Sequence, residues 1–142
     1  MAEHRRPMDR RIVLLIASAL VASSLVFALV AQRPDPYCFG YELGLGLLGG
    51  VGAPFVAAFV CGVALALLKA RLVAYVLLVA SLSIVVGMGF VVGLWLGYDH
   101  CAPSSPLERG VPWAIIGLMA SLVGVVPGFA VGRLIDLSRR RG

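Results

Sequence analysis

Residues 43–68 read LGLGLLGGVGAPFVAAFVCGVALALL, a run of 26 residues that contains no Asp, Glu, Lys, Arg or His. An uncharged apolar run of this length can cross the roughly 30 Å hydrocarbon core of a bilayer as a single helix. In hydrocarbon every backbone N–H and C=O must be paired within the segment, and a helix achieves this by itself. The stretch therefore predicts a membrane-spanning helix.

Three further uncharged apolar stretches occur along the chain. They cover residues 12–31, 72–97 and 111–132. Of the 142 residues, 61% are hydrophobic, and the mean hydropathy is +0.99. Soluble domains contain about 45–50% apolar residues. We therefore predict an all-α, four-helix transmembrane bundle that forms one integral membrane domain over residues 1–142.

The charged residues lie in the gaps between the four stretches, and the net charge is +5. Cationic residues precede the first stretch, separate the second from the third and follow the fourth: Arg5, Arg6, Arg10, Arg11, Lys69, Arg71, Arg133, Arg139, Arg140 and Arg141. Because membrane proteins keep excess Lys and Arg on the cytoplasmic side, we expect both termini in the cytoplasm of a plasma-membrane protein. Attraction to anionic lipid heads accounts for these clusters without nucleic acid as a partner.

The order of spans and gaps predicts two helical hairpins. The outer loops 32–42 and 98–110 each close one hairpin, and an inner turn at 69–71 joins the two. Because this turn is so short, the second and third spans should be antiparallel neighbours. The expected partners are the lipid bilayer and, beyond it, another membrane subunit or a second copy of the chain.

Small residues recur at every fourth position in three of the spans. The predicted packing glycines are Gly46, Gly50, Gly62, Gly89, Gly93, Gly97, Gly124, Gly128 and Gly132. No hydrophobic force joins helices in lipid, so close backbone approach through small residues supplies the packing. The pattern leaves open whether these glycines face the same chain or a partner. Pro54 and Pro127 predict kinks in the second and fourth spans, because proline removes a backbone hydrogen bond.

Cys38 and Cys101 fall in the two outer loops. Thiols outside the cytoplasm oxidise, so we predict a disulfide that ties the two hairpins together. Its loop-entropy contribution is about 4 kcal/mol as an upper limit, because membrane insertion already restricts the unfolded chain. Non-reducing mass spectrometry should find the two peptides linked, and free alkylation of both thiols in isolated membranes would exclude the bridge.

The chain lacks the residue patterns that several chemistries need. Asp99, His100 and the loop cysteines match no CxxC or HxxxH spacing for zinc. The GxGxxG at 44–49 opens an apolar span instead of following a strand, so it predicts no nucleotide site. A proton or ion relay usually needs an ionisable residue within a span, and the four stretches contain none. We expect no cofactor, no metal and no catalytic residue.

These observations predict a non-enzymatic membrane protein that acts through helix packing, as an accessory subunit or a self-assembling component. The first alternative is a small oligomeric transporter or channel whose path runs between copies. The second is an outer-face thiol or disulfide protein that depends on Cys38 and Cys101 alone.

Overall fold

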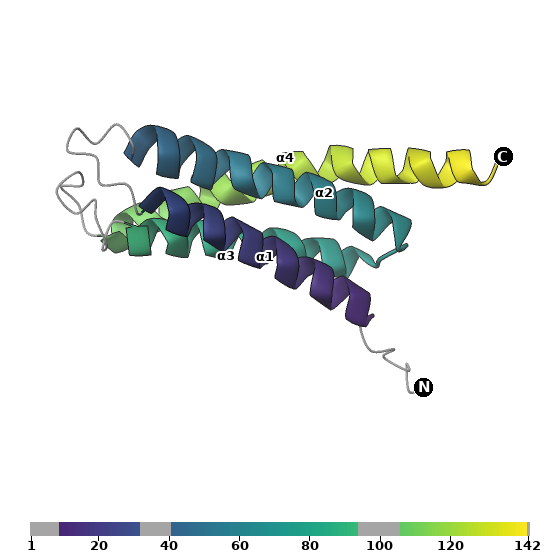
Figure 1. The fold of residues 1–142 in the computed structure, drawn as a ribbon, viewed down its shortest axis with the longest axis horizontal. Helices are drawn as coiled ribbons and strands as arrows, with labels where there is room; N and C mark the ends of the chain where they lie inside the picture. The colour runs from purple at the N-terminus through teal and green to yellow at the C-terminus, as the bar shows by residue number, and fades with distance from the viewer. Residues whose placement is uncertain (1–8, 32–40, 94–105, 142) are drawn as a thin grey trace.

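The computed structural model describes residues 9–31, 41–93 and 106–141, which are helical apart from short turns. The elements, in chain order, are α1 Arg10–Ala31, the π-helix η1 Tyr41–Gly52, α2 Ala53–Leu67, α3 Leu72–Gly93 and α4 Pro106–Arg139 (Figure 1). Four helical segments of the described residues are long and apolar enough to cross a membrane. The prediction of an all-α protein with four such helices is confirmed.

The fourth helix is longer than the predicted span 111–132. α4 has 34 residues, so it measures about 51 Å and exceeds a hydrocarbon layer of about 30 Å. Its last turns are charged, and Asp136 pairs with Arg140 at 3.0 Å. Figure 1 shows these turns projecting beyond the connection between α2 and α3. The apolar run predicts where the span lies but not how far the helix continues past it.

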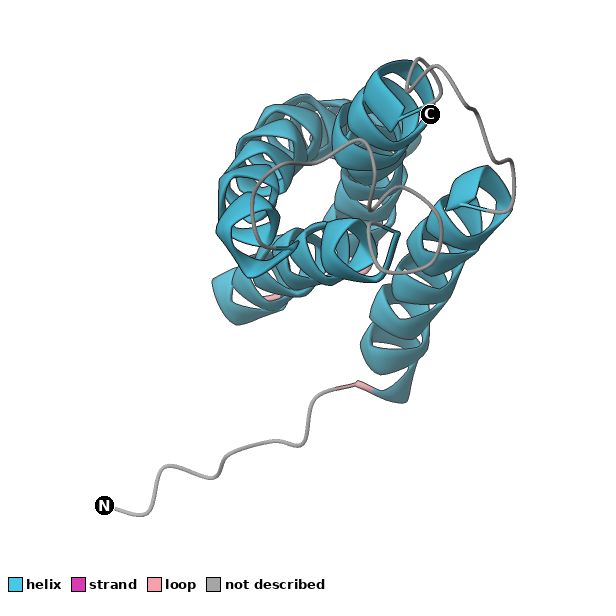
Figure 2. Ribbon diagram, turned by 90° about the vertical axis from the view of Figure 1, so that its left-hand side faces the viewer, coloured by secondary structure: helices cyan, strands magenta, loops and turns pink. Residues whose placement is uncertain are grey.

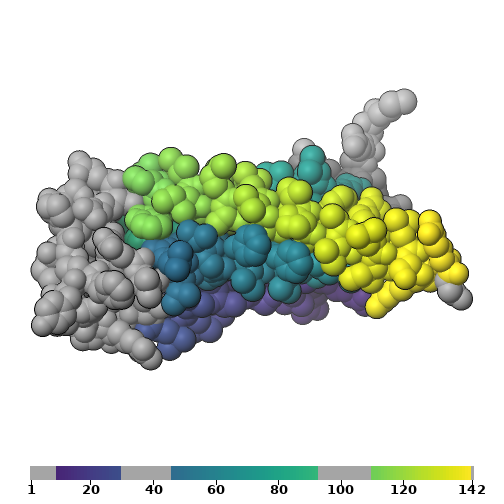
Figure 3. Space-filling view, turned by 90° about the horizontal axis from the view of Figure 1, so that it is seen from above, coloured from purple at the N-terminus to yellow at the C-terminus, as the bar shows by residue number. Residues whose placement is uncertain are grey.

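α4 is the central helix of the bundle, because it packs along α2 on one side and along α3 on the other. α2 and α4 run in the same direction, and α3 runs opposite to both (Figure 1). Figure 3 shows α2 and α4 side by side along one face of the molecule. The short turn joins α2 to α3, yet α2 packs mainly on α4. The most extensive helix pair is therefore one that no short turn connects.

α1 lies to one side of the body formed by α2, α3 and α4 (Figure 2). Its contacts with α3 and α2 are less extensive than those that α4 makes. The buried residues of α1 are Ile12, Ala19, Ser23 and Phe27. Spacings of seven and four residues place them along one side of the helix. Leu15, Ile16 and Leu20 are partly buried against the same core, and the opposite side of α1 is exposed.

The second span begins as a π-helix and continues as an α-helix. The glycines of η1 are Gly44, Gly46, Gly49, Gly50 and Gly52. Glycine has low α-helix propensity, so this segment holds the α-helical register weakly. Gly52 keeps helical dihedral angles (φ −65°, ψ −53°), so η1 and α2 form one continuous helical segment. The α-helical register starts beside Pro54, whose missing N–H is tolerated in a first turn.

α2 ends in a Schellman motif at the turn to α3. The N–H of Ala70 donates to the carbonyl of Leu65 at 2.9 Å, and the N–H of Lys69 donates to Ala66 at 3.1 Å. Lys69 has a φ of 52°, in the left-handed region that glycine usually occupies at this position. A lysine there costs about 1–2 kcal/mol relative to a right-handed conformation.

The core of the bundle contains a stripe of fully buried side chains on α3, which packs against α4, α1 and α2. The stripe consists of Leu78, Leu82, Val86 and Phe90, and Leu65 of α2 is equally buried. Four-residue steps keep the α3 residues on one side of the helix. In lipid, the stabilisation from this core comes from dispersion between well-packed atoms.

Candidate functional site

α2 and α4 approach each other closely at three glycines of α4. Gly124, Gly128 and Gly132 lie opposite the backbone carbonyls of Phe55, Phe59 and Val63, respectively. A Cβ atom on Gly124 would lie 2.5 Å from the facing oxygen, and one on Gly132 would lie 2.7 Å from it. Real Cβ atoms essentially never come closer than 3.0 Å to a neighbour. A hydrogen of each glycine Cα takes the place of that atom, which allows weak Cα–H···O contacts between parallel helices.

α2 contributes one glycine of its own to the same interface. A Cβ atom on Gly62 would lie 3.0 Å from the carbonyl oxygen of Val125 and 3.4 Å from the Cα of Gly128. The two backbones are therefore in contact from both sides. These glycines face another helix of the same chain, so α2 already covers the small-residue face of α4.

Three aromatic rings join α1, α3 and α4 at the end of the bundle where η1 lies. The rings of Phe90 and Trp113 stack with centroids 4.1 Å apart and an interplanar angle of 4°. Phe27 meets Phe90 edge-on, with centroids 5.7 Å apart. A Cβ atom on Gly50 would lie 2.8 Å from the Trp113 ring, and one on Gly89 would lie 2.7 Å from Phe27. The glycines of η1 and α3 make room for these large rings.

α3 and α4 are joined by a hydrogen bond as well as by close packing. The hydroxyl of Ser83 donates to the carbonyl of Ala114 at 2.6 Å. One turn further along α3, a Cβ atom on Gly87 would lie 2.9 Å from the Cβ of Ala114. A Cβ atom on Gly117 would lie 2.8 Å from the Cβ of Val86. Small residues thus hold α4 against α3 as they hold it against α2.

The four-residue spacing of glycines does not predict all of these contacts. Gly87, Gly110 and Gly117 all lie between α3 and α4. The sequence has a different signal for two of them, because Gly110 and Gly117 are separated by seven residues. Seven residues are close to two full turns, so such glycines return to nearly the same side of a helix.

A second aromatic contact ties the start of α3 to the end of α4. The rings of Tyr75 and Phe129 meet edge-on with centroids 5.7 Å apart. The guanidinium of Arg133 lies over the Phe129 ring, 5.4 Å from its centroid. Such a placement lets the apolar stem of an arginine cover a ring while its charge reaches the polar layer.

The remaining predicted residues of the spans occupy varied positions. Gly46 is buried in η1, and Gly93 is the last residue of α3. Pro54 is buried in the first turn of α2. Pro127 is exposed within α4, which continues as a helix to Arg139. The kinks expected at the two prolines stay predictions.

Cys38, Cys101 and Gly97 lie outside the described residues, so the predicted disulfide stays a prediction. Cys61 is a free, buried cysteine of α2. Among residues 9–31, 41–93 and 106–141, no three side chains of His, Cys, Asp or Glu come together as metal ligands could. What the described helices offer chemically is a set of close backbone contacts and apolar surfaces.

The chain matches no protein-family model, no curated protein and no solved structure. The basis for a function is therefore the contacts between the helices and the helix surfaces that remain exposed.

Proposed function

We propose that this chain is a small multi-pass membrane protein that acts as an accessory or self-assembling subunit, through helix packing and without catalytic chemistry of its own. The observation that carries the proposal is the exposed side of α1. Ala17, Val21, Ser24 and Ala28 are all exposed there. Spacings of four, three and four residues place them along one side of the helix. The small residues Ala17, Ser24 and Ala28 on this side let a second helix approach closely in lipid.

The small-residue surface of α4 supports the same assignment, because another helix of the same chain already covers it. α2 covers Gly124, Gly128 and Gly132 of α4, so a partner helix could reach them only by opening the bundle. α1 has the smallest buried share of the four spans, 22% compared with 39% for the second span. α1 is therefore the helix with the most surface to offer a partner.

The serine hydroxyls favour packing over a transport path. Ser81 and Ser121 donate to carbonyls of their own helices, and Ser83 donates across to α4. A polar path between copies would use such hydroxyls to face water or solute. Here they satisfy backbone acceptors instead, which is typical of helices that pack in lipid.

The distribution of charge supports a plasma-membrane orientation with both termini in the cytoplasm. The start of α1, the end of α4 and the turn between α2 and α3 lie at the same end of the bundle (Figure 1). The cations at this end include Arg10, Lys69, Arg71 and Arg139. Excess positive charge marks the cytoplasmic side of membrane proteins.

Site-specific photocrosslinking in native membranes tests the proposal. A photoreactive residue at Val21 of α1 should give an adduct with a second polypeptide, whose mass distinguishes another copy from a different subunit. The matched control is Ile84 of α3, because both side chains are similarly exposed, at 60% and 64%. The control should give far less adduct. Recovery of the monomer alone from both positions would remove the basis for a subunit role.

A further inference from the structure

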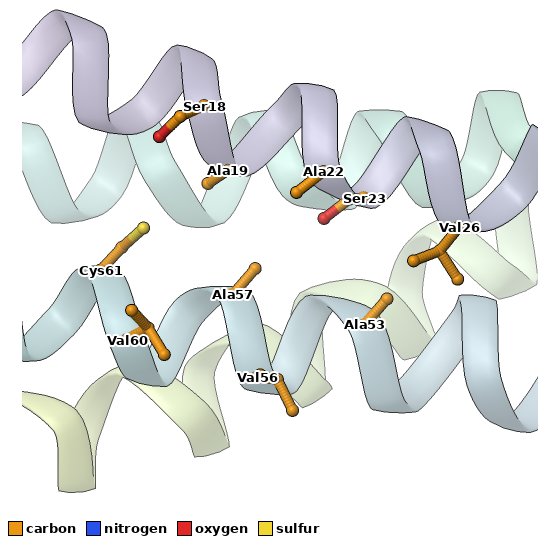
Figure 4. Close-up of a pocket in the computed structure, with 10 residues that line it drawn as sticks. All are labelled: Ser18, Ala19, Ala22, Ser23, Val26, Ala53, Val56, Ala57, Val60 and Cys61. Carbon is orange, nitrogen blue, oxygen red and sulfur yellow. The ribbon is translucent and has the colours of Figure 1, made fainter.

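A groove with a volume of about 450 Å³ opens between α1 and α2 (Figure 4). Its walls combine small apolar residues with a hydroxyl and a thiol: Ala19, Ala22, Ala53, Ala57, Ser23 and Cys61. The volume lies within the range of about 300–1,000 Å³ that is usual for small-molecule sites. The helix contacts described above leave this space unfilled.

Ser23 is the unusual residue of the groove. Its side chain is only 2% exposed, and its hydroxyl has no hydrogen-bond partner among the described residues. Figure 4 shows this hydroxyl directed toward the space between the two helices. Ser18, which also lines the groove, donates to the carbonyl of Leu15 at 2.8 Å instead. Buried hydroxyls are normally paired, so the Ser23 hydroxyl is a donor that a ligand in the groove can satisfy.

The length of the groove matches a small molecule. The lining residues span 18–26 on α1 and 53–61 on α2, which corresponds to about 12 Å along each axis at 1.5 Å per residue. A partner helix that crosses a hydrocarbon layer of about 30 Å would extend well beyond both ends of the groove.

We infer that the groove between α1 and α2 binds a small apolar molecule with a carbonyl or similar acceptor, which receives a hydrogen bond from Ser23. Val56 and Val60 line the groove and are each 58% exposed, so the groove opens toward the hydrocarbon. The ligand therefore enters from the bilayer. This binding role goes beyond the subunit role and does not depend on it.

Benzophenone is a suitable probe, because it is an apolar ketone that attaches to neighbouring C–H groups under light. The full chain in lipid nanodiscs should show saturable labelling of peptides containing residues 18–26 and 53–61. Ser23→Ala should weaken apparent affinity about fivefold, as expected for the loss of one neutral hydrogen bond. Ser81→Ala is the matched control, because this serine donates within α3 and does not line the groove, so its loss should leave affinity unchanged. Ala57→Leu should fill the groove and abolish the labelling.

Two results would overturn the inference. One is labelling that rises in proportion to probe concentration and falls equally on the exposed residues of α3, which is what passive dissolution in the lipid produces. The other is an equal affinity in the Ser23→Ala and Ser81→Ala variants. If circular dichroism shows that Ala57→Leu does not fold, the comparison of the two serine variants decides the question alone.

Discussion

Replacement of Gly124 by alanine should push α2 and α4 apart. The added Cβ atom would lie 2.5 Å from the carbonyl oxygen of Phe55 and 3.2 Å from the Cβ of Ala58. Ordinary contact begins at 3.4 Å, so the helices must separate locally by nearly 1 Å. The carbonyl belongs to a helix backbone and cannot turn away, unlike the end of a flexible side chain. The contacts of Gly128 and Gly132 would open together with that of Gly124.

The expected cost follows from these distances. A radial gap of about 0.5–1 Å loses about a quarter to a half of the dispersion energy of each atom pair across it. Overpacking of a well-packed interface typically costs about 1–3 kcal/mol. Alanine has a helix propensity that is better than that of glycine by about 1 kcal/mol, which offsets part of this cost. Because the obstacle is a backbone carbonyl, the overpacking cost should lie at the upper end, about 2–3 kcal/mol, so we expect Gly124→Ala to lower the free energy of unfolding by about 1–2 kcal/mol.

Reversible unfolding in mixed micelles measures this difference, with far-ultraviolet circular dichroism followed as the fraction of SDS rises. The control is Val123→Ile, which adds one methyl group at the adjacent position, where the side chain is 60% exposed. The free energy of unfolding of this exposed variant should stay within about 0.5 kcal/mol of that of the unchanged protein. If Gly124→Ala is as stable as Val123→Ile, or more stable, then the inferred close contact between α2 and α4 at Gly124 is wrong.

Three further predictions use the same unfolding titration. Lys69→Gly should raise the free energy of unfolding by about 1 kcal/mol, because glycine adopts the positive φ without strain. Lys69→Ala should not raise it, and an equal gain from both would point to the charge instead. Trp113→Ala should cost about 2–3 kcal/mol through loss of the stacked ring, and Trp113→Phe should recover part of it. Ser83→Ala should cost about 0.6 kcal/mol, as an average interhelical hydrogen bond does. Ser81→Ala removes only a bond within α3 and should change stability less.

The positions of the helices could be predicted from the sequence because insertion depends on a property that each residue contributes nearly independently. The uncharged run 72–97 predicts where α3 lies. The same reasoning places the end of the fourth span at 132, whereas α4 continues to Arg139. The hydropathy ends where charge begins, but an α-helix pairs its own backbone and can continue into water. Hydropathy therefore predicts the span rather than the full helix.

The partners of the glycines could not be predicted in the same way. The four-residue spacing of Gly124, Gly128 and Gly132 indicates a surface that can approach a backbone, but it contains no information on which backbone. The structure selects α2, which is distant in the chain and parallel to α4. The four-residue spacing does not predict the contacts of Gly117 and Gly87, because close contacts also arise from seven-residue spacing or from a single glycine opposite a small residue such as Ala114.

The sequence by itself determined that this protein is helical, that it has four apolar spans and that its cationic residues lie in the gaps between them. These properties follow from transfer of side chains to lipid, which is nearly additive along the chain. Only the tertiary structure decided that α4 is the central helix and that α2 covers its glycines. It also decided that α1 lies to one side of the bundle, with a groove between α1 and α2. The physical reason is that dispersion and close backbone contact depend on the shapes of two surfaces together. A single helix sequence describes only one of them.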